Sequence, residues 1–286
     1  MILVTGATGK LGTAVIENLL KKTPADQVVG LARDADKAAA LKQKGVSIRL
    51  GDYDDIASLD AAMQGVDKVL LVAGTNEDKR VEQHGNVINA AKKAGVSCIA
   101  YTSRTLKDPA TLVNKLMLGH FQTEDLVKQS GLKFMIFRNV LYMDTLPQFL
   151  GGQVFETGIQ VPTGDGVVPF ALRSEIGEAI ANALLRSDCD DRTYLLTASQ
   201  AYSMNDVADA QSRLSGKNVK YAPLEKSEFE AQLKARGLPE VVAHRIVGFM
   251  TDVKNGQESE VSSELEHLLG RKPASLEAGL KPLFDL

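Results

Sequence analysis

Short apolar runs alternate with amphipathic stretches through the first half of the chain. Runs rich in Val, Ile and Leu predict buried strands, and stretches with apolar residues at three- and four-residue spacing predict helices. The strands are expected at 2–4, 27–33, 46–50, 68–73, 97–102 and 133–138. Helices are expected between them, at 35–44, 58–63, 80–94 and 112–129, besides one that follows the first strand.

The pattern changes after residue 139. Residues 144–168 are rich in Gly and Pro, which break regular elements. Further on, we expect β-like pieces at 153–155 and 159–161, helices at 175–185 and 203–214, and a strand at 193–197. Ser203 and Asp206 have the spacing of a capping box. The remaining chain is charged and reads as mostly helical.

This order of elements predicts an α/β protein. Alternating apolar strands and helices are typical of a parallel sheet covered on both faces, here a doubly wound Rossmann-type fold. We expect residues 1–143 to form the dinucleotide-binding domain, with the sheet completed by about 169–198. Residues 144–168 and 199–286 are expected to form a smaller, mostly helical lobe over the carboxyl edge of the sheet.

The turn behind the first strand carries three glycines. Gly6 suits a tight turn, Gly9 permits close approach of a pyrophosphate, and Gly12 permits close helix–strand packing. A helix with Leu11, Val15 and Leu19 on one stripe follows, and its free N–H groups attract phosphate. The alternative is a glycine-rich turn without a ligand. The predicted contacts are Gly6, Thr8, Gly9, Lys10, Leu11 and Gly12.

Composition narrows the classes of function. The 286 residues carry a net charge of −3, which disfavours a general nucleic-acid or anionic-membrane surface. The chain begins with a strand and its glycine turn, so we expect no signal peptide, and no apolar run is long enough for a membrane span. Cys98 and Cys189 lie far apart in sequence, which predicts two free thiols in a reducing cytoplasm and no metal site.

A set of short motifs, in order and covering nearly the whole chain, carries a family resemblance. The motifs are Thr5–Gly12, Ala32-Arg33-Asp34, Gly51-Asp52-Tyr53, Gln83-His84-Gly85-Asn86-Val87-Ile88, Ile99-Ala100-Tyr101-Thr102-Ser103, His120 with Glu124, Arg138-Asn139 with Tyr142, and residues 193–207. With these motifs the chain resembles the NmrA-like, atypical short-chain dehydrogenase/reductase family. Within that family it is similar to bacterial NADPH:quinone oxidoreductases of the quinone-oxidoreductase-2 type and to triphenylmethane reductase.

The ends of the predicted strands supply further cofactor contacts. Arg33 ends the second strand, where an Arg accommodates the 2′-phosphate of NADP(H), and Lys37 adds positive charge. Asp34 is an alternative partner for a ribose hydroxyl. The resemblance implies that Asp52 and Tyr53 flank the adenine, although Gly-Asp-Tyr-Asp is also good turn chemistry. By the logic of the fold, we expect Ala73, Gly74 and Thr75 near the pyrophosphate and the nicotinamide ribose.

The catalytic pair of ordinary short-chain dehydrogenases is absent. Ser103, which we also expect to contact the cofactor, stands where their serine belongs, but Leu116 and His120 occupy the tyrosine and lysine positions of Tyr-x-x-x-Lys. Reduction of a ketone needs a proton donor, whereas reduction of a quinone leaves a phenolate whose pKa lies near ~10. The absence of this pair therefore argues against alcohol and sugar substrates, whereas quinones can be reduced without it.

These observations lead to a functional hypothesis. We expect an NADPH-dependent reductase of quinones or related conjugated acceptors, with His120, Asn139 and Tyr142 lining the acceptor site. The resemblance implies the placement of Asn139 and Tyr142 beside the nicotinamide. The alternative is a redox-sensing regulator that binds NADP and a protein partner without turnover. The sequence leaves monomer and homodimer open.

Overall fold

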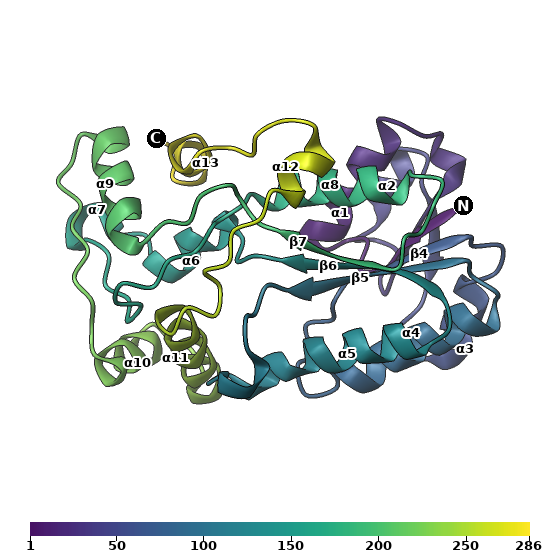
Figure 1. Cartoon of the computed structure of the whole chain (residues 1–286), viewed down its shortest axis with the longest axis horizontal. Helices are drawn as coiled ribbons and strands as arrows, with labels where there is room; N and C mark the ends of the chain where they lie inside the picture. The colour runs from purple at the N-terminus through teal and green to yellow at the C-terminus, as the bar shows by residue number, and fades with distance from the viewer.

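The computed structural model describes residues 1–286 and contains one seven-stranded, all-parallel sheet (Figure 1). The strands lie in the order β3-β2-β1-β4-β5-β6-β7, so the chain winds outward from β1 in both directions. Their bounds are β1 Ile2–Val4, β2 Val28–Ala32, β3 Ser47–Leu50, β4 Lys68–Leu71, β5 Cys98–Arg104, β6 Lys133–Asn139 and β7 Arg192–Leu196. This order confirms the doubly wound parallel sheet predicted from the sequence.

Helices cover both faces of the sheet. In Figure 1, α1, α8 and α12 lie above the strands, and α3, α4 and α5 lie below them. These helices are α1 Lys10–Leu20, α3 Ile56–Ala62, α4 Arg80–Lys93, α5 Leu118–Gln129, α8 Arg173–Leu184 and α12 Glu264–Leu269, with the short α2 Ala39–Gln43 beside β3. None of the helices combines the length and hydrophobicity that a membrane span requires.

A group of helices extends beyond the carboxyl edge of the sheet, on the left of Figure 1. They are α6 Leu146–Leu150, α7 Val154–Thr157, α9 Met204–Ser215, α10 Lys226–Ala235, α11 Glu240–Lys254 and α13 Leu276–Leu283. Ser203 and Asp206 form the expected capping box at the start of α9. The lobe therefore overhangs the edge where ligands bind in this class of fold.

Two apolar cores hold the layers together. One, of 18 buried residues, fills the face under α3, α4 and α5. The other, of 49 buried residues, runs from Val15 in α1 and Ile180 in α8 to Phe229 and Leu280 in the lobe. The lobe is thus packed on the sheet domain through a continuous core, and the domain boundaries given above stay a prediction.

Several local expectations were wrong. The helix expected at 112–129 starts only at Leu118, because the Asp252 carboxylate accepts the N–H groups of Val113 (2.6 Å) and Asn114 (2.9 Å). The β-like piece at 153–155 falls in α7, which ends at Gly158 with φ +75°. The piece at 159–161 makes one bridge, between Ile159 and Tyr221.

The cysteines are not free thiols, because Cys98 and Cys189 form a disulfide. Cys98 begins β5, and Cys189 lies in the connection that leads into β7. Parallel strands all begin at one edge of a sheet, so residues 91 positions apart meet there. Sequence distance misled the expectation, and the argument from free thiols for a reducing compartment no longer holds.

Candidate active site

A cavity of about 820 Å³ opens at the carboxyl edge of the sheet. Its volume lies in the range of small-molecule and cofactor sites. Every predicted cofactor contact except Ser103 lines it: Gly6, Thr8, Gly9, Lys10, Leu11, Gly12, Arg33, Lys37, Asp52, Tyr53, Ala73, Gly74 and Thr75. The fold therefore brings together residues from the ends of β1, β2, β3 and β4.

The glycine turn forms the wall at the end of β1. Gly6 has φ +57°, and a Cβ on Gly12 would lie 2.3 Å from the Gly6 carbonyl oxygen. Only glycine fits both positions. Gly9 precedes α1 and makes no side-chain cap, and the N–H groups of Lys10, Leu11 and Gly12 have no backbone acceptor. These N–H groups and the positive end of α1 are suited to bind an anion.

The end of β2 presents a cation to the cavity. The Arg33 side chain is 76 % exposed and lies 3.9 Å from the Asp52 carboxylate. The Asp34 carboxylate accepts the backbone N–H groups of Asp36 (2.9 Å) and Lys37 (3.4 Å). One oxygen of Asp34 is therefore engaged in the turn, and both Arg33 and Asp34 line the cavity.

Tyr53 is held firmly against the end of the sheet. Its hydroxyl donates to the Val72 carbonyl oxygen (2.9 Å) and accepts from the Thr5 hydroxyl. Asn86 donates to the Tyr53 carbonyl oxygen (2.9 Å). Burial raises the pKa of Tyr53, so the ring stays neutral. The Tyr53 ring is thus a fixed wall beside the cavity.

A buried chain of hydrogen bonds fixes Gly74 at the end of β4. The Gly74 N–H donates to Nε2 of His84 (3.0 Å), so the His84 proton must sit on Nδ1. Nδ1 then donates to the Thr123 hydroxyl (2.9 Å), which donates to the Gly119 carbonyl oxygen (2.8 Å). Burial, and then the charge of Arg80, lower the pKa of His84 to about 3.

Ser103 lies outside the cavity and is 2 % exposed. Its hydroxyl donates to Glu124 (2.7 Å), which also receives a bidentate pair from Arg138 (2.8 and 2.7 Å). Lys128 lies 3.5 Å from the same carboxylate. Ser103 thus belongs to a buried ion network under the edge of the sheet.

His120 is also buried, with 5 % exposure, and does not line the cavity. Its Nδ1 shares a hydrogen bond with the Tyr101 hydroxyl (2.9 Å). Burial, and then the charges of Arg80 and Arg104, lower the pKa of His120 well below its ordinary value near 6.5. His120 is therefore a neutral imidazole at physiological pH and carries no imidazolium proton to donate.

Asn139 and Tyr142 lie together at the end of β6. The Asn139 amide donates to the Tyr142 hydroxyl (3.1 Å), while its Oδ1 is buried without a partner. The Arg173 guanidinium stacks on the Tyr142 ring at 4.5 Å and lies 3.3 Å from Asp144. Asn139 and Tyr142 do not line the cavity themselves, but Arg173 does, so it connects the predicted acceptor residues to the predicted cofactor site.

Sequence reasoning missed several residues that line the cavity. Arg173 comes from the start of α8, and Asp54 and Gln83 are joined by a hydrogen bond of 2.9 Å. The position of Asp54, directly after the Gly-Asp-Tyr motif, was a signal for its placement. Arg173 had no comparable signal, because the Gly- and Pro-rich segment before it hides its return to the sheet.

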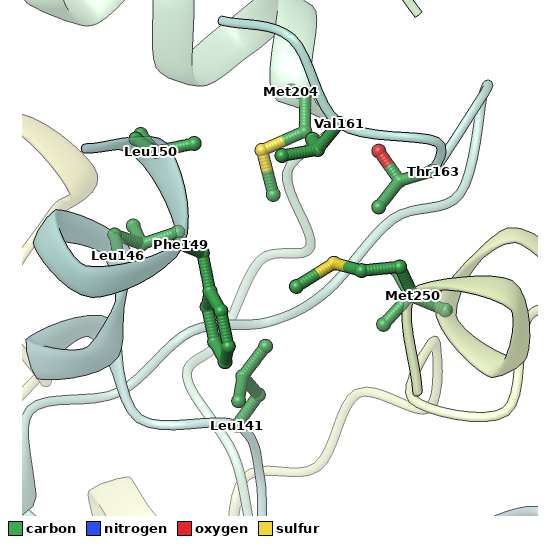
Figure 2. Close-up of a pocket in the computed structure, with 9 residues that line it drawn as sticks. Leu141, Leu146, Phe149, Leu150, Val161, Thr163, Met204 and Met250 are labelled. Carbon is green, nitrogen blue, oxygen red and sulfur yellow. The ribbon is translucent and has the colours of Figure 1, made fainter. Parts of the chain in front are cut away.

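The small lobe contains an apolar void (Figure 2). Leu141, Phe149, Val161 and Met250 point into it, and its volume of about 10 Å³ accommodates at most a water molecule. Phe149 also stacks on Phe249, with ring centroids 6.2 Å apart. In this conformation the void is too small to receive an aromatic acceptor.

Comparisons with known proteins agree with this architecture. Quinone oxidoreductase 2 of Escherichia coli is 35 % identical over 100 % of this chain and 99 % of that protein. Triphenylmethane reductase of Citrobacter sp., solved with NADP(H), has a TM-score of 0.92 at 32 % identity, over 99 % of this chain and 100 % of that chain. The NADPH-dependent quinone oxidoreductase of E. coli, solved with NADPH, has a TM-score of 0.91 at 35 % identity over the same shares of the two chains. Because the model of the NmrA-like family matches residues 1–280, the chain belongs to the NmrA-like family.

Proposed function

We propose that the protein is an NADPH-dependent reductase that transfers a hydride to a quinone or a related conjugated acceptor. The observation that carries the proposal is the cavity of about 820 Å³ that joins the start of α1 to Arg33. The two solved relatives described above were crystallised with NADP(H) or NADPH and have nearly the same fold. When bound, NADPH supplies the hydride.

The residues present fit such a cofactor. The unpaired N–H groups at the start of α1 suit the pyrophosphate, and glycines at 6, 9 and 12 keep the approach clear. We assign Arg33 and Lys37 to the 2′-phosphate and the side of the cavity at Asp52 and Tyr53 to the adenine. We assign the segment Ala73, Gly74 and Thr75 to the nicotinamide ribose.

The absence of a strong acid favours quinones over simple ketones. Leu116 stands at the expected tyrosine position, in a short 3₁₀ turn, where its carbonyl oxygen accepts from Arg80 (3.0 Å). His120 is neutral and bound to Tyr101. A quinone accepts the hydride and becomes a hydroquinone anion, which water protonates later. We therefore propose Asn139 and Tyr142 as residues that position the acceptor.

The direct test is NADPH oxidation by the purified protein with a panel of quinones, followed by absorbance. We expect turnover by the wild type and loss of NADPH binding in Gly9→Val, whose side chain would crowd the phosphate path, since a Cβ there already lies 3.2 Å from the Gly6 carbonyl oxygen. Gly152→Ala is the matched control, because nothing lies within 4 Å of its Cβ position. Tight NADP binding with no turnover of quinones, enones, aldehydes or dyes would overturn the proposal and favour a regulator.

A further inference from the structure

Backbone contacts bring Tyr142 and Arg173 together from separate segments of the chain. Tyr142 forms a parallel bridge with Ala171, and the Met143 N–H donates to the Ala171 carbonyl oxygen (2.9 Å). The Asp144 carboxylate accepts the backbone N–H of Arg173 (2.8 Å). These contacts hold the two backbone segments together, so Tyr142 and Arg173 are neighbours through more than their own side-chain contact.

Arg173 is the one residue lining the cavity that comes from the second half of the chain. All other residues that line it lie within the first 83 positions, at the ends of β1 to β4 or nearby. Arg173 reaches it from the side of β6, on the far side of β4 from Arg33 in the strand order. This is the side of the cavity that remains for the nicotinamide and the acceptor once Arg33 is assigned to the 2′-phosphate.

Both side chains have unused hydrogen-bonding capacity. The Tyr142 oxygen accepts from Asn139, and no protein group accepts the Tyr142 hydrogen. Burial raises the pKa of Tyr142, so the hydroxyl keeps this hydrogen at physiological pH. Arg173 is 14 % exposed, and apart from its ion pair with Asp144 its guanidinium N–H groups have no protein acceptor. A guanidinium has five such donors, so most of them stay free for a ligand.

We propose that the Tyr142 hydroxyl and the Arg173 guanidinium together form the oxyanion site of the reductase, in place of the absent Tyr-x-x-x-Lys pair. The inference rests on the proposed function. The quinone gains a hydride, with its electron pair, from NADPH, and one quinone oxygen becomes a phenolate. Tyr142 donates a hydrogen bond to this oxygen, Arg173 offsets its charge, and water supplies the proton that completes the hydroquinone.

The test compares two acceptors that differ in where the charge goes. A benzoquinone becomes an oxyanion, whereas a cationic triphenylmethane dye such as crystal violet takes the hydride at carbon and becomes neutral. An oxyanion site stabilises only the first reaction. We therefore expect Arg173→Met to lower kcat/KM for the quinone by about a hundredfold and to leave dye reduction unchanged or faster. Tyr142→Phe should lower quinone turnover by about tenfold.

Three controls separate this role from a structural one. Arg173→Lys keeps the charge and should recover part of the quinone activity. Arg271→Met removes another arginine that is paired to α8, through Glu175 (2.6 Å) and Glu178 (2.8 Å), but away from the cavity, and should leave both reactions unchanged. NADPH affinity, measured by fluorescence titration, should stay the same in Arg173→Met.

The outcomes distinguish the two hypotheses. If the wild type reduces neither acceptor, the proposed function itself fails. If it reduces quinones but Arg173→Met loses both reactions equally, or loses NADPH affinity by the same factor, Arg173 is structural or binds the cofactor and the oxyanion site is wrong. If the wild type accepts only quinones, a series of quinones whose hydroquinones differ in acidity replaces the dye. The deficit of Arg173→Met must then grow with the basicity of the phenolate, and a constant deficit overturns the inference.

Discussion

Two histidines near the site are kept neutral by their surroundings. His84 is fully buried and accepts the Gly74 N–H, a bond that an imidazolium could not make. His120 is buried near Arg80 and Arg104. In both cases the folded state disfavours the protonated ring. These residues therefore link the stability of the protein, more than its chemistry, to pH.

The direction of this pH dependence follows from the two states. The unfolded chain protonates His84 near pH ~6.5, whereas the folded protein holds its pKa at about 3. Unfolding therefore takes up a proton below pH ~6.5, and stability falls as the pH falls from 7 towards 3. Between pH 7 and 5 the loss from His84 amounts to about 2 kcal/mol.

Urea unfolding of wild type and His84→Gln at pH 7 and pH 5 measures this effect. The stability difference between the two proteins should shrink by about 2 kcal/mol at pH 5. His244→Gln is the control, because His244 is 80 % exposed and should show no such change. An equal difference at both pH values would mean that folded His84 protonates normally.

The Arg33 side chain should determine the choice of cofactor. Only NADPH presents a 2′-phosphate, and a charge-assisted hydrogen bond contributes about 1.5–3 kcal/mol. Arg33→Ala is expected to weaken NADPH binding by about ten- to a hundredfold and NADH binding much less. Arg213→Ala, which removes a surface arginine of α9, is the control. Equal losses for the two cofactors would show that Arg33 does not contact the phosphate.

At the scale of elements, the segment that follows α11 joins the lobe to the sheet through Glu258. Glu258 is fully buried, and its carboxylate accepts from the Arg104 guanidinium, the Thr105 hydroxyl (2.9 Å) and the Leu141 N–H (3.1 Å). Arg104 and Thr105 lie at the end of β5, and Leu141 follows the end of β6, next to the proposed acceptor residues. One carboxylate thus sets the positions of two connections that border the site.

Removal of this carboxylate should be costly. Glu258→Gln leaves Arg104 largely buried without its counter-ion, and loss of one partner of a buried pair typically costs about 3–5 kcal/mol. We expect a decrease of that order in the free energy of unfolding measured with urea. Glu277→Gln breaks the exposed pair with Arg213 and should change it by less than about 1 kcal/mol. Similar losses of unfolding free energy in the two variants would contradict the proposed role of Glu258 in joining the lobe to the sheet.

The sequence predicts those elements that are buried along their whole length, because their burial requires a continuous run of apolar residues. Leu3, Val29 and Leu70 are fully buried in parallel strands, so each strand reads as an apolar run, and its carboxyl end marks the cavity. The contact between Arg173 and Tyr142 depends on a bridge across 29 residues of Gly- and Pro-rich chain. No local periodicity encodes such a bridge, and the same holds for the pairing of Cys98 with Cys189.

At the scale of the whole molecule, the disulfide is part of the continuous core that connects the sheet to the lobe. Cys98 belongs to the core that runs from the sheet into the lobe, and Cys189 packs against it. A cross-link over 91 residues restricts the unfolded chain strongly. The sheet and the lobe are therefore expected to unfold together.

Reduction of the disulfide between Cys98 and Cys189 should lower the stability of the protein. Dithiothreitol is expected to lower the free energy of unfolding of the wild type by about 2–4 kcal/mol. The double variant Cys98→Ala/Cys189→Ala should show the same loss and no further response to the reductant. Unfolding curves in urea, with and without dithiothreitol, measure both effects. A wild type that does not respond to reductant would show that the bond contributes nothing to stability.

The same bond also divides the chain topologically. Residues 98 to 189 form a closed covalent ring that contains Asn139, Tyr142 and Arg173, while the glycine turn lies on the open tail before it. A protease cut in the exposed stretch 107–111 would open the ring without releasing a fragment. The nicked protein would migrate as one species without reductant and as two with it, so the acceptor half and the cofactor half stay tethered even after the backbone between them is broken.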